Sequence, residues 1–475
     1  MGTSMRTAAL LLAHAALAAG VSVAVRPRVT VVGAGVSGLC CARTLHAAGV
    51  DVSVIERADG VGGRVRSDIV DGFILDRGFQ VFLTEYPEPR SVLDLDALDL
   101  RPFLPGALVQ LGAERHLVAD PFRRPQDLLR GALAPVGSLV DKARVALFAV
   151  LQFLQPVDAI FAKPPRSTLA FLRAELAVSD VMIERFFRPF YQGIFLAPLD
   201  EQDARMFEFV FKMFTLGVAA LPAKGLGEVP KQLARALPED TVRTRTLVLG
   251  VSATSVRVAE VGAEKAEGAR EPDDHTLESD AVVLAVDRPA LAAIDGAHGA
   301  AGTDGERSST AIYFAIDGPP PIAEPILVLN GECGRVAPGA SSAVLNNVCF
   351  PSSVASSYAP AGKALASCTV VGDPAVTDAE LERAVREQLG RWFGAERVAA
   401  WRHLRTYRVR YAQPTQLGAR GGFDWPARLD GGLYRCGDHT SSPTLNGAMA
   451  SGRRAAEAVL EDLRARGRLA ASGRA

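Results

Sequence analysis

The sequence predicts an α/β protein whose parallel sheet is assembled from segments that lie far apart along the chain. Three observations support this fold class. The apolar run 29–32 leads through a glycine-rich turn into an apolar segment of helical character, and strand and helix segments then alternate along most of the chain. Residues 280–286 form a near-continuous apolar run, typical of a strand buried on both faces of a parallel sheet. A strand–turn–helix pattern returns at residues 431–456.

The first turn carries three glycines, Gly33, Gly35 and Gly38, in the pattern G-x-G-x-x-G. The first glycine permits the tight turn, and the second lets backbone N–H groups approach a pyrophosphate. The third allows close packing of helix on strand, and the helix N-terminus adds unpaired donors. The turn therefore predicts a dinucleotide site, although the pattern alone does not say which dinucleotide.

Two features after the first turn extend this prediction. The strand expected at residues 51–55 ends in Glu56, about 20 residues on, where an acidic side chain accepts hydrogen bonds from ribose hydroxyls. A second glycine turn with a cation, Gly62-Gly63-Arg64, follows, and residues 73–82 are expected to form a strand that breaks at Gly78.

The middle of the chain is expected to be helical, and the part after it rich in strands. Pro87 and Pro89 mark the entry to the helical part. The expected helices are 126–133, 138–154, 167–176, 179–187, 203–214, 228–237 and 378–393. The expected strands are 241–248, 255–258, 280–286, 311–316, 326–329 and 365–371, with an exposed hairpin loop at 262–274.

The bulk composition excludes several functions. A net charge of −1 over 475 residues gives no basic field for nucleic acid, so no nucleic-acid partner is expected. The six cysteines form no C-x-x-C pair and are expected to be buried thiols. The seven histidines show no ligand spacing, so no metal site is predicted.

The N-terminus is expected to be a leader. Residues 8–25 are almost wholly apolar and follow Arg6, which is typical of a signal or targeting segment. No twin-arginine signal is present, so we expect an organelle (plastid) or endomembrane address. A membrane anchor is a weaker expectation, and an extension without any address is the alternative.

Near the C-terminus, Gly437 and Asp438 form a turn between a short strand and a helix that opens on small residues around Gly447 and Ala448. An Asp at such a turn can accept hydrogen bonds from a polyol chain. Backbone donors at the helix start can stabilise negative charge on a bound ring. The alternative is a surface turn followed by an ordinary helix.

These pieces occur in an order that resembles the flavin amine oxidoreductase superfamily, which includes amine oxidases, protoporphyrinogen oxidases, phytoene desaturases and carotenoid isomerases. The resemblance uses the block 33–64, the turn Lys224-Gly225-Leu226, the strand 281–285 and the C-terminal turn and helix. It covers nearly all of the chain after the N-terminal segment.

The resemblance implies a Rossmann-like FAD-binding domain that is discontinuous in sequence, and a mixed α+β substrate domain with a helical insertion. The implied FAD-binding segments are 27–85, 222–305 and 415–465, after a leader at 1–26. The implied substrate domain comprises 86–221 and 306–414.

The resemblance also implies thirteen cofactor contacts. Around the FAD pyrophosphate and ribose they are Gly33, Gly35, Gly38, Glu56 and Arg57. Toward the flavin, adenine and ribityl chain they are Gly62, Gly63, Arg64, Val248, Gly437, Asp438, Gly447 and Ala448. Gly78 and Gln80 are expected near the flavin as well. No cysteine matches a covalent attachment pattern, so the FAD is expected to be non-covalent.

The substrate half departs from the amine oxidases, because Tyr407, Tyr411 and Tyr434 suggest no aromatic cage for an amine. Segments 185–195 and 407–414 look more like the desaturase and porphyrinogen oxidase branch. The aromatic stretch 206–214 is expected either to be core or to line an apolar tunnel or membrane face, which would suit peripheral membrane association.

The expected activity is hydride transfer from an apolar or amine small molecule to flavin N5. One alternative is a flavin-dependent isomerase or hydratase of carotenoid-like polyenes, and another is a non-catalytic flavin-binding scaffold. An NAD(P)-dependent dehydrogenase would leave Gly437, Asp438 and the second glycine turn without roles. His439 could approach the flavin or be an ordinary loop residue, so no catalytic residue is assigned.

Overall fold

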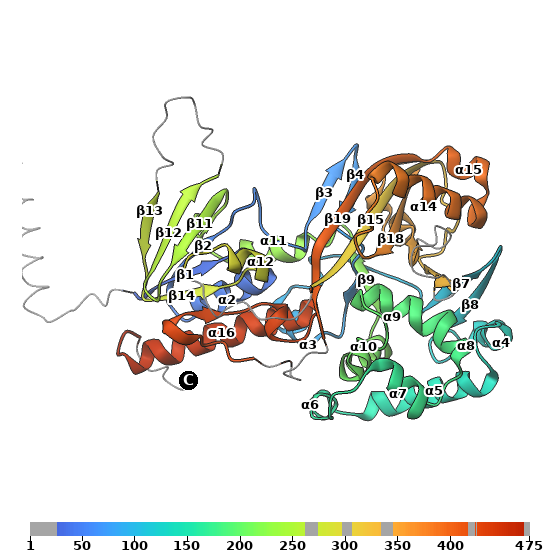
Figure 1. Cartoon of the computed structure of the whole chain (residues 1–475), viewed down its shortest axis with the longest axis horizontal. Helices are drawn as coiled ribbons and strands as arrows, with labels where there is room; N and C mark the ends of the chain where they lie inside the picture. The colour runs from blue at the N-terminus through green and yellow to red at the C-terminus, as the bar shows by residue number, and fades with distance from the viewer. Residues whose placement is uncertain are drawn as a thin grey trace, which may run out of the picture.

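The computed structural model describes residues 26–261, 274–296, 306–333, 345–416, 423 and 425–469. They form two regions, one around a parallel five-stranded sheet and one around a mixed seven-stranded sheet (Figure 1). The α/β class is therefore confirmed. The expected leader lies outside the described residues apart from Arg26, and the expected domain boundaries remain predictions.

The parallel sheet draws its strands from distant parts of the chain. In spatial order they are β10 (Val242–Arg243), β2 (Asp51–Ile55), β1 (Arg28–Val32), β14 (Ala281–Leu284) and β20 (Tyr434–Arg435). Each neighbouring pair is parallel. All four residues of β14 are buried, as its continuous apolar sequence predicts.

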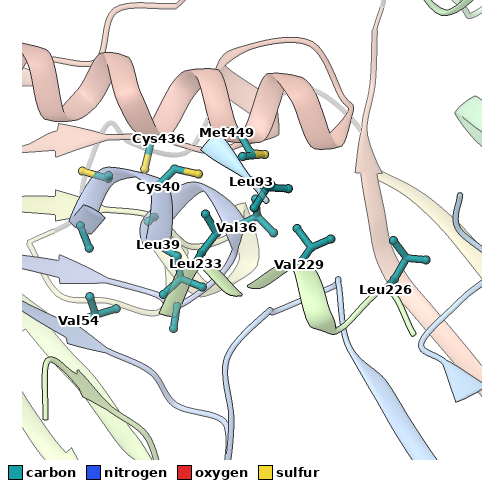
Figure 2. Close-up of a cluster of buried hydrophobic side chains, with 14 of the residues drawn as sticks. Val36, Leu39, Cys40, Val54, Leu93, Leu226, Val229, Leu233, Cys436 and Met449 are labelled. Atoms are coloured by element: carbon teal, nitrogen blue, oxygen red, sulfur yellow. The ribbon is translucent and has the colours of Figure 1, made fainter. Parts of the chain in front are cut away.

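Three helices cover one face of this sheet: α2 (Val36–Ala47), α11 (Glu228–Arg235) and α16 (Leu445–Ala465). Helices α2 and α16 lie side by side (Figure 1). Figure 2 shows the apolar cluster around α2, in which Cys40 lies near Cys436 and Met449 on the side of α16, and Leu39 lies near Leu233 of α11. This cluster connects the N-terminal and C-terminal parts of the chain.

The strand expected at 241–248 is wrong as a single element. The chain forms β10, then leaves the parallel sheet at Arg245, whose φ of 52° is left-handed. It continues as β11 (Thr246–Val251) in a separate antiparallel sheet with β12 (Ser255–Glu260) and β13 (His275–Glu278). The hairpin is confirmed, while most of its expected loop, residues 262–273, lies outside the described residues.

The seven-stranded sheet forms the second region. Its spatial order is β19 (Arg402–Pro414), β15 (Glu306–Asp317), β18 (Lys363–Val371), β17 (Asn347–Cys349), β16 (Leu327–Asn330), β7 (Gly106–Leu111) and β8 (Glu114–Ala119). Only the β16–β7 pair is parallel. Helices α14 (Asp378–Phe393) and α15 (Ala395–Ala399) pack together, and α14 side chains share an apolar cluster with this sheet.

The chain also forms several shorter elements. They are the hairpin β3 (Ser67–Val70) and β4 (Phe73–Asp76), the sheet β5 (Phe82–Leu83), β9 (Ala219–Pro222) and β6 (Leu100–Pro102), and the helices α3 (Pro87–Val92), α12 (Arg288–Ala292) and α13 (Pro351–Val354). The expected break near Gly78 is confirmed, because β4 and β5 lie on either side of it.

The helical insertion is confirmed. It comprises α4 (Leu128–Leu133), α5 (Leu139–Leu154), α6 (Val157–Phe161), α7 (Thr168–Ala174), α8 (Asp180–Met182), α9 (Arg188–Phe195) and α10 (Ala204–Leu216). Ser138, Ser167 and Asp203 accept hydrogen bonds from the first turns of α5, α7 and α10, which is why these helices begin where expected. No helix in the described ranges has the length and apolar composition needed to cross a membrane.

Candidate cofactor site

At two positions of the first glycine turn a side chain would collide with neighbouring backbone atoms, and at the third it would meet open space. A Cβ on Gly33, whose φ is 106°, would lie 2.6 Å from the Ala285 carbonyl oxygen. A Cβ on Gly38 would lie 2.0 Å from the Gly33 carbonyl oxygen, so helix α2 packs directly on the turn. Gly35 is the N-cap of α2, and a Cβ there would meet no described atom within 4 Å. The turn therefore leaves room for an anionic group at a helix N-terminus.

The second glycine turn lies directly against the first. The Gly62 amide donates to the Ala34 carbonyl oxygen at 2.8 Å, and Gly35 forms an isolated β-bridge with Gly62. A Cβ on Gly63 would lie 3.6 Å from the Gly35 Cα. Two turns separated in sequence thus form one glycine-lined surface.

Glu56 braces the first turn. Its Oε2 accepts a hydrogen bond from the Ala34 amide and its Oε1 accepts one from the Ala58 amide, each at 2.8 Å. Each carboxylate oxygen retains a second lone pair that can accept from a ribose hydroxyl. Arg57 is exposed next to it. Val248 is buried with Val32 and Ile55, where β1 and β2 end.

Arg64 and Asp438, 374 residues apart, form a bidentate ion pair. Arg64 Nη1 donates to Asp438 Oδ2 at 2.8 Å and Arg64 Nη2 donates to Oδ1 at 2.6 Å. Nη1 also donates to the Ala412 carbonyl oxygen, and the guanidinium lies 5.2 Å from the Tyr411 ring centroid. Gln80 Nε2 donates to the Arg64 carbonyl oxygen at 3.0 Å. The pair joins the second glycine turn to the C-terminal turn.

Electrostatics keep both members of this pair charged. Burial by itself would raise the pKa of the Asp438 carboxyl, but the Arg64 guanidinium outweighs it and holds the pKa below the ordinary value. Burial likewise opposes the charge on Arg64, and the Asp438 carboxylate reverses this and raises the pKa of Arg64. The site therefore contains a fixed dipole of two full charges.

The C-terminal turn is tied to the start of α16. The Gly437 amide donates to Ser451 Oγ at 3.0 Å, and Ser451 Oγ donates to the Ala448 carbonyl oxygen at 2.8 Å. Thr444 caps the helix by accepting from the Gly447 amide at 3.0 Å. A Cβ on Gly447 would lie 1.9 Å from the Ser442 carbonyl oxygen. These contacts bring the first turn of α16 to the turn that carries Asp438.

Two buried polar atoms beside the ion pair have no hydrogen-bond partner among the described residues: the Tyr411 hydroxyl and His439 Nε2. Burial lowers the pKa of His439 to about 4, with Arg64 adding to this effect and Asp438 opposing it, so the ring is neutral at pH 7. The orphaned donors and acceptors, together with the open face of Gly35, fit a dinucleotide with pyrophosphate and polyol groups.

The substrate half shows a different arrangement. The Tyr407 hydroxyl donates to Asp68 at 2.7 Å and the Tyr434 hydroxyl donates to Asp462 at 2.5 Å, so these two tyrosines and Tyr411 form no cage. Of the two expectations for residues 206–214, packing in the core is the one that their burial favours. Met206, Phe207, Phe209, Val210 and Met213 are buried, which assigns the stretch to the helical core.

Arg188 forms a bidentate pair with Glu184 on the same helical segment, and Lys224 is exposed. Within the described residues, no group of three His, Cys, Asp or Glu side chains could hold a metal ion. Five cysteines are buried thiols, as expected, whereas Cys333 is only half-buried.

Sequence reasoning missed Tyr411 and Ser451 as site residues, and it missed Asp76. Asp76 accepts hydrogen bonds from Ser67 Oγ at 2.5 Å, from the Leu226 amide at 2.9 Å and from the Tyr358 hydroxyl at 2.9 Å. The only signal for Asp76 was its position before the break at Gly78. Nothing in the spacing pointed to Tyr358, which lies 282 residues away.

Comparisons with known proteins agree with this geometry. The family described as flavin containing amine oxidoreductase matches residues 36–460. The coproporphyrinogen III oxidase of Propionibacterium freudenreichii subsp. freudenreichii is 30% identical over 181 residues, which span 36% of this chain and 32% of that protein. The carotenoid 3,4-desaturase of Haloarcula japonica is 42% identical over 81 residues, 15% of this chain and 16% of that protein. A structure of wild-type putrescine oxidase bound to putrescine aligns with a TM-score of 0.62 at 17% identity, covering 92% of this chain and 99% of the other.

Proposed function

The chain belongs to the flavin-containing amine oxidoreductase family, and from this premise we propose that it is an FAD-dependent oxidoreductase that removes hydride from a small-molecule substrate. The observation that carries the proposal is the convergence of three separated segments. Gly35, Arg64 and Asp438 come from different parts of the chain and are linked through backbone contacts and one bidentate ion pair. A site that binds only the nucleotide part of a cofactor would need only the turn that carries Gly35.

We propose that FAD is held without a covalent bond. Gly33, Gly35, Gly38 and the N-terminus of α2 would hold the pyrophosphate, Glu56 and Arg57 the ribose, and Val248 the adenine. Further toward the flavin, the proposed contacts are Gly62, Gly63, Arg64, Gly437, Asp438, Gly447 and Ala448. When bound, the flavin supplies the hydride-accepting chemistry. The chain's own task is to orient it and to place helix N–H groups where negative charge develops.

The proposed substrate is apolar rather than a small amine. Holding an ammonium group requires a carboxylate or an aromatic cage, and Tyr407, Tyr411 and Tyr434 each contact a different partner. The helical region next to the seven-stranded sheet supplies a large aromatic core instead. An apolar substrate partitions into lipid, so we extend the proposal to peripheral association with a membrane.

We propose that the segments that build the two sheets have different roles, one set binding FAD and the other binding the substrate. Residues 27–85, 222–305 and 415–465 would bind FAD, because they contribute the strands of the parallel sheet. Residues 86–221 and 306–414 would bind the substrate, because they contribute the seven-stranded sheet and the helices of the insertion.

The absorbance spectrum of the purified protein tests the cofactor. We expect a yellow protein whose flavin is released on denaturation, since no covalent bond holds it. The flavin is then mixed anaerobically with a porphyrinogen, a carotenoid precursor or a diamine in turn, and we expect the porphyrinogen or the carotenoid precursor, each with a large hydrocarbon framework, to bleach it faster than the diamine.

Three outcomes would contradict parts of this proposal. A protein that is colourless and stays so with added FAD overturns the cofactor. Conversion of a polyene without net bleaching assigns an isomerase or hydratase instead. Bleaching by the diamine alone overturns the apolar substrate.

A further inference from the structure

The exposed apolar side chains of this protein are concentrated on one short stretch. Eleven of the seventeen large apolar side chains exposed among the described residues lie between Phe122 and Leu154, in and around α4 and α5. They are Phe122, Leu128, Leu129, Leu133, Leu139, Val140, Leu147, Val150, Leu151, Phe153 and Leu154. Leu129, Leu133 and Leu154 are each more than 70% exposed. We call this set the α4–α5 face. Concentration of apolar area on one surface marks an interaction site, whereas scattered single side chains do not.

Helix α5 packs one side inward and leaves an apolar side exposed. Phe148 and Gln152 face inward and are buried, and α10 packs on that side. With 3.6 residues per turn, Val140, Leu147, Leu151 and Leu154 share the other side, and all of them are exposed. An apolar stripe of this kind is normally covered by a core, a partner or a membrane. Helix α5 lies at the outer margin of the helical region, away from the seven-stranded sheet (Figure 1).

Within the stretch that carries this face, the exposed charged side chains are all arginines, and one of them, Arg123, is paired with Asp120. Between residues 122 and 154 the exposed charged residues are Arg123, Arg130 and Arg144, whereas Asp127 is half-buried and Asp141 is buried. The protein as a whole has a net charge of −1, so this local excess of exposed cations is not a general property of the chain. An apolar surface edged by arginines is complementary to a leaflet with anionic head groups.

Carbonyl oxygens at the C-terminus of α4 and near the C-terminus of α5 have partners within the protein. Lys142 Nζ donates to the carbonyl oxygens of Ala132 and Ala134, each at 2.7 Å. Lys212 Nζ donates to the carbonyl oxygens of Gln152 and Phe153, at 2.7 Å and 3.1 Å, near the C-terminus of α5. Backbone groups that already have partners can leave water at a small cost, as entry into the lipid interface requires.

We infer that the α4–α5 face is a docking surface for the anionic leaflet of a lipid bilayer. In this arrangement the exposed leucines and valines enter the head-group and acyl boundary while Arg130 and Arg144 contact lipid phosphates. The inference rests on the membrane association proposed above and gives it a location, but it does not depend on the redox chemistry. A second copy of this chain is the other occupant that such a surface could take.

Co-sedimentation of the full-length protein with vesicles tests this inference. The vesicles are phosphatidylcholine alone, or phosphatidylcholine with phosphatidylglycerol. The variant L147D/L151D places two carboxylates on the α4–α5 face, and I69D/V376D is the matched control, because Ile69 and Val376 are also exposed but lie elsewhere. Every protein carries the same N-terminal segment. Circular dichroism and the flavin absorbance report whether each variant is folded.

The wild type and the control should bind the anionic vesicles equally, and L147D/L151D should bind at least about tenfold more weakly. R130E should weaken binding to anionic vesicles without changing binding to phosphatidylcholine alone. Equal binding by L147D/L151D and the wild type would overturn the inference. So would a wild-type dimer that becomes a monomer in L147D/L151D while neither binds vesicles, since the face would then be an interface between copies. Vesicle binding is scored by sedimentation, so a failure to bleach the flavin leaves this result unaffected.

Discussion

Arg64 and Asp438 form a bidentate ion pair in the candidate site. Asp438 is buried and Arg64 keeps a third of its side chain exposed, so removing either partner leaves a charge in a poorly hydrated place. We expect R64A and D438A each to lower the free energy of unfolding by about 2–4 kcal/mol and to reduce the amount of flavin that co-purifies.

A double-mutant cycle measures the interaction energy between Arg64 and Asp438 separately from the contacts that each residue makes with its other neighbours. The variant R64A/D438A should be destabilised by less than the sum of the two single variants, because neither charge is left alone. R64K should not restore flavin retention fully, since an ammonium cannot make the bidentate contact. Additive losses, measured by chemical unfolding of the four proteins, would contradict the pairing.

At the scale of residues, the sequence predicts which residue types a local turn requires, but it does not predict which distant side chains contact each other. Gly33 and Gly38 were predictable because the turn itself demands them. That Arg64 pairs with Asp438, or that Tyr411 lies under the guanidinium, was not, because a spacing of hundreds of residues carries no information on contact. The roles of the thirteen implied cofactor residues remain predictions, although the structure brings the two glycine turns, Arg64 and Asp438 together.

Helix α2 follows the first glycine turn and helix α16 follows the C-terminal turn, and the two helices pack closely on each other. At the level of elements, their packing therefore sets how the two turns lie in the site. A Cβ on Gly452 of α16 would lie 2.1 Å from the Ser37 carbonyl oxygen of α2. Alanine normally stabilises a helix interior by up to about 1 kcal/mol relative to glycine. Here we expect G452A to destabilise the protein by about 1–3 kcal/mol and to weaken flavin retention, because the helices must separate.

The matched control for G452A is G131A in α4. A Cβ on Gly131 would have no described atom closer than 3.9 Å, so this variant should melt at or above the wild-type temperature. Opposite shifts of the two thermal midpoints would support the close crossing, and equal shifts would contradict it.

Element boundaries were predictable where a side chain defines them. Ser138, Ser167 and Ser179 were recognisable as helix starts, and each accepts a hydrogen bond from the following turn. The strand expected at 241–248 failed because the apolar composition is similar on both sides of Arg245. The left-handed φ at that residue, which sends the chain into a second sheet, has no signature in the sequence.

The whole molecule is held together partly by a buried carboxyl group that joins its two regions. Asp76 at the end of β4 accepts from Ser67, from the Leu226 amide in the turn before α11, and from Tyr358. Its carbonyl oxygen accepts from the Tyr313 hydroxyl of β15, the second strand of the seven-stranded sheet, at 2.8 Å. The order of segments predicted a discontinuous parallel sheet, but this junction depends on contacts that no local pattern contains.

The pH dependence of stability should report on this junction. Burial raises the pKa of Asp76 to about 6, against the hydrogen bonds that favour the ionised form, whereas the ordinary value in an unfolded chain is 3.8. The folded state therefore binds this proton more tightly than the unfolded state. The stabilisation from the proton is complete below pH 3.8 and is lost as the pH rises to about 6.

The variant D76N cannot titrate and isolates this contribution. The difference in unfolding free energy, wild type minus D76N, should fall by up to about 3 kcal/mol between pH 4 and pH 7 and then stay constant. Other carboxyl groups, such as Asp438, shift in the opposite direction, but they are common to both proteins and cancel in the difference. Urea unfolding at a series of pH values measures it. A difference that is flat over this range would mean that the pKa of Asp76 in the fold is the ordinary one, and a difference that rises would mean that it is lowered; in both cases the hydrogen bonds from Ser67, Leu226 and Tyr358 would offset or outweigh the burial of the carboxyl group.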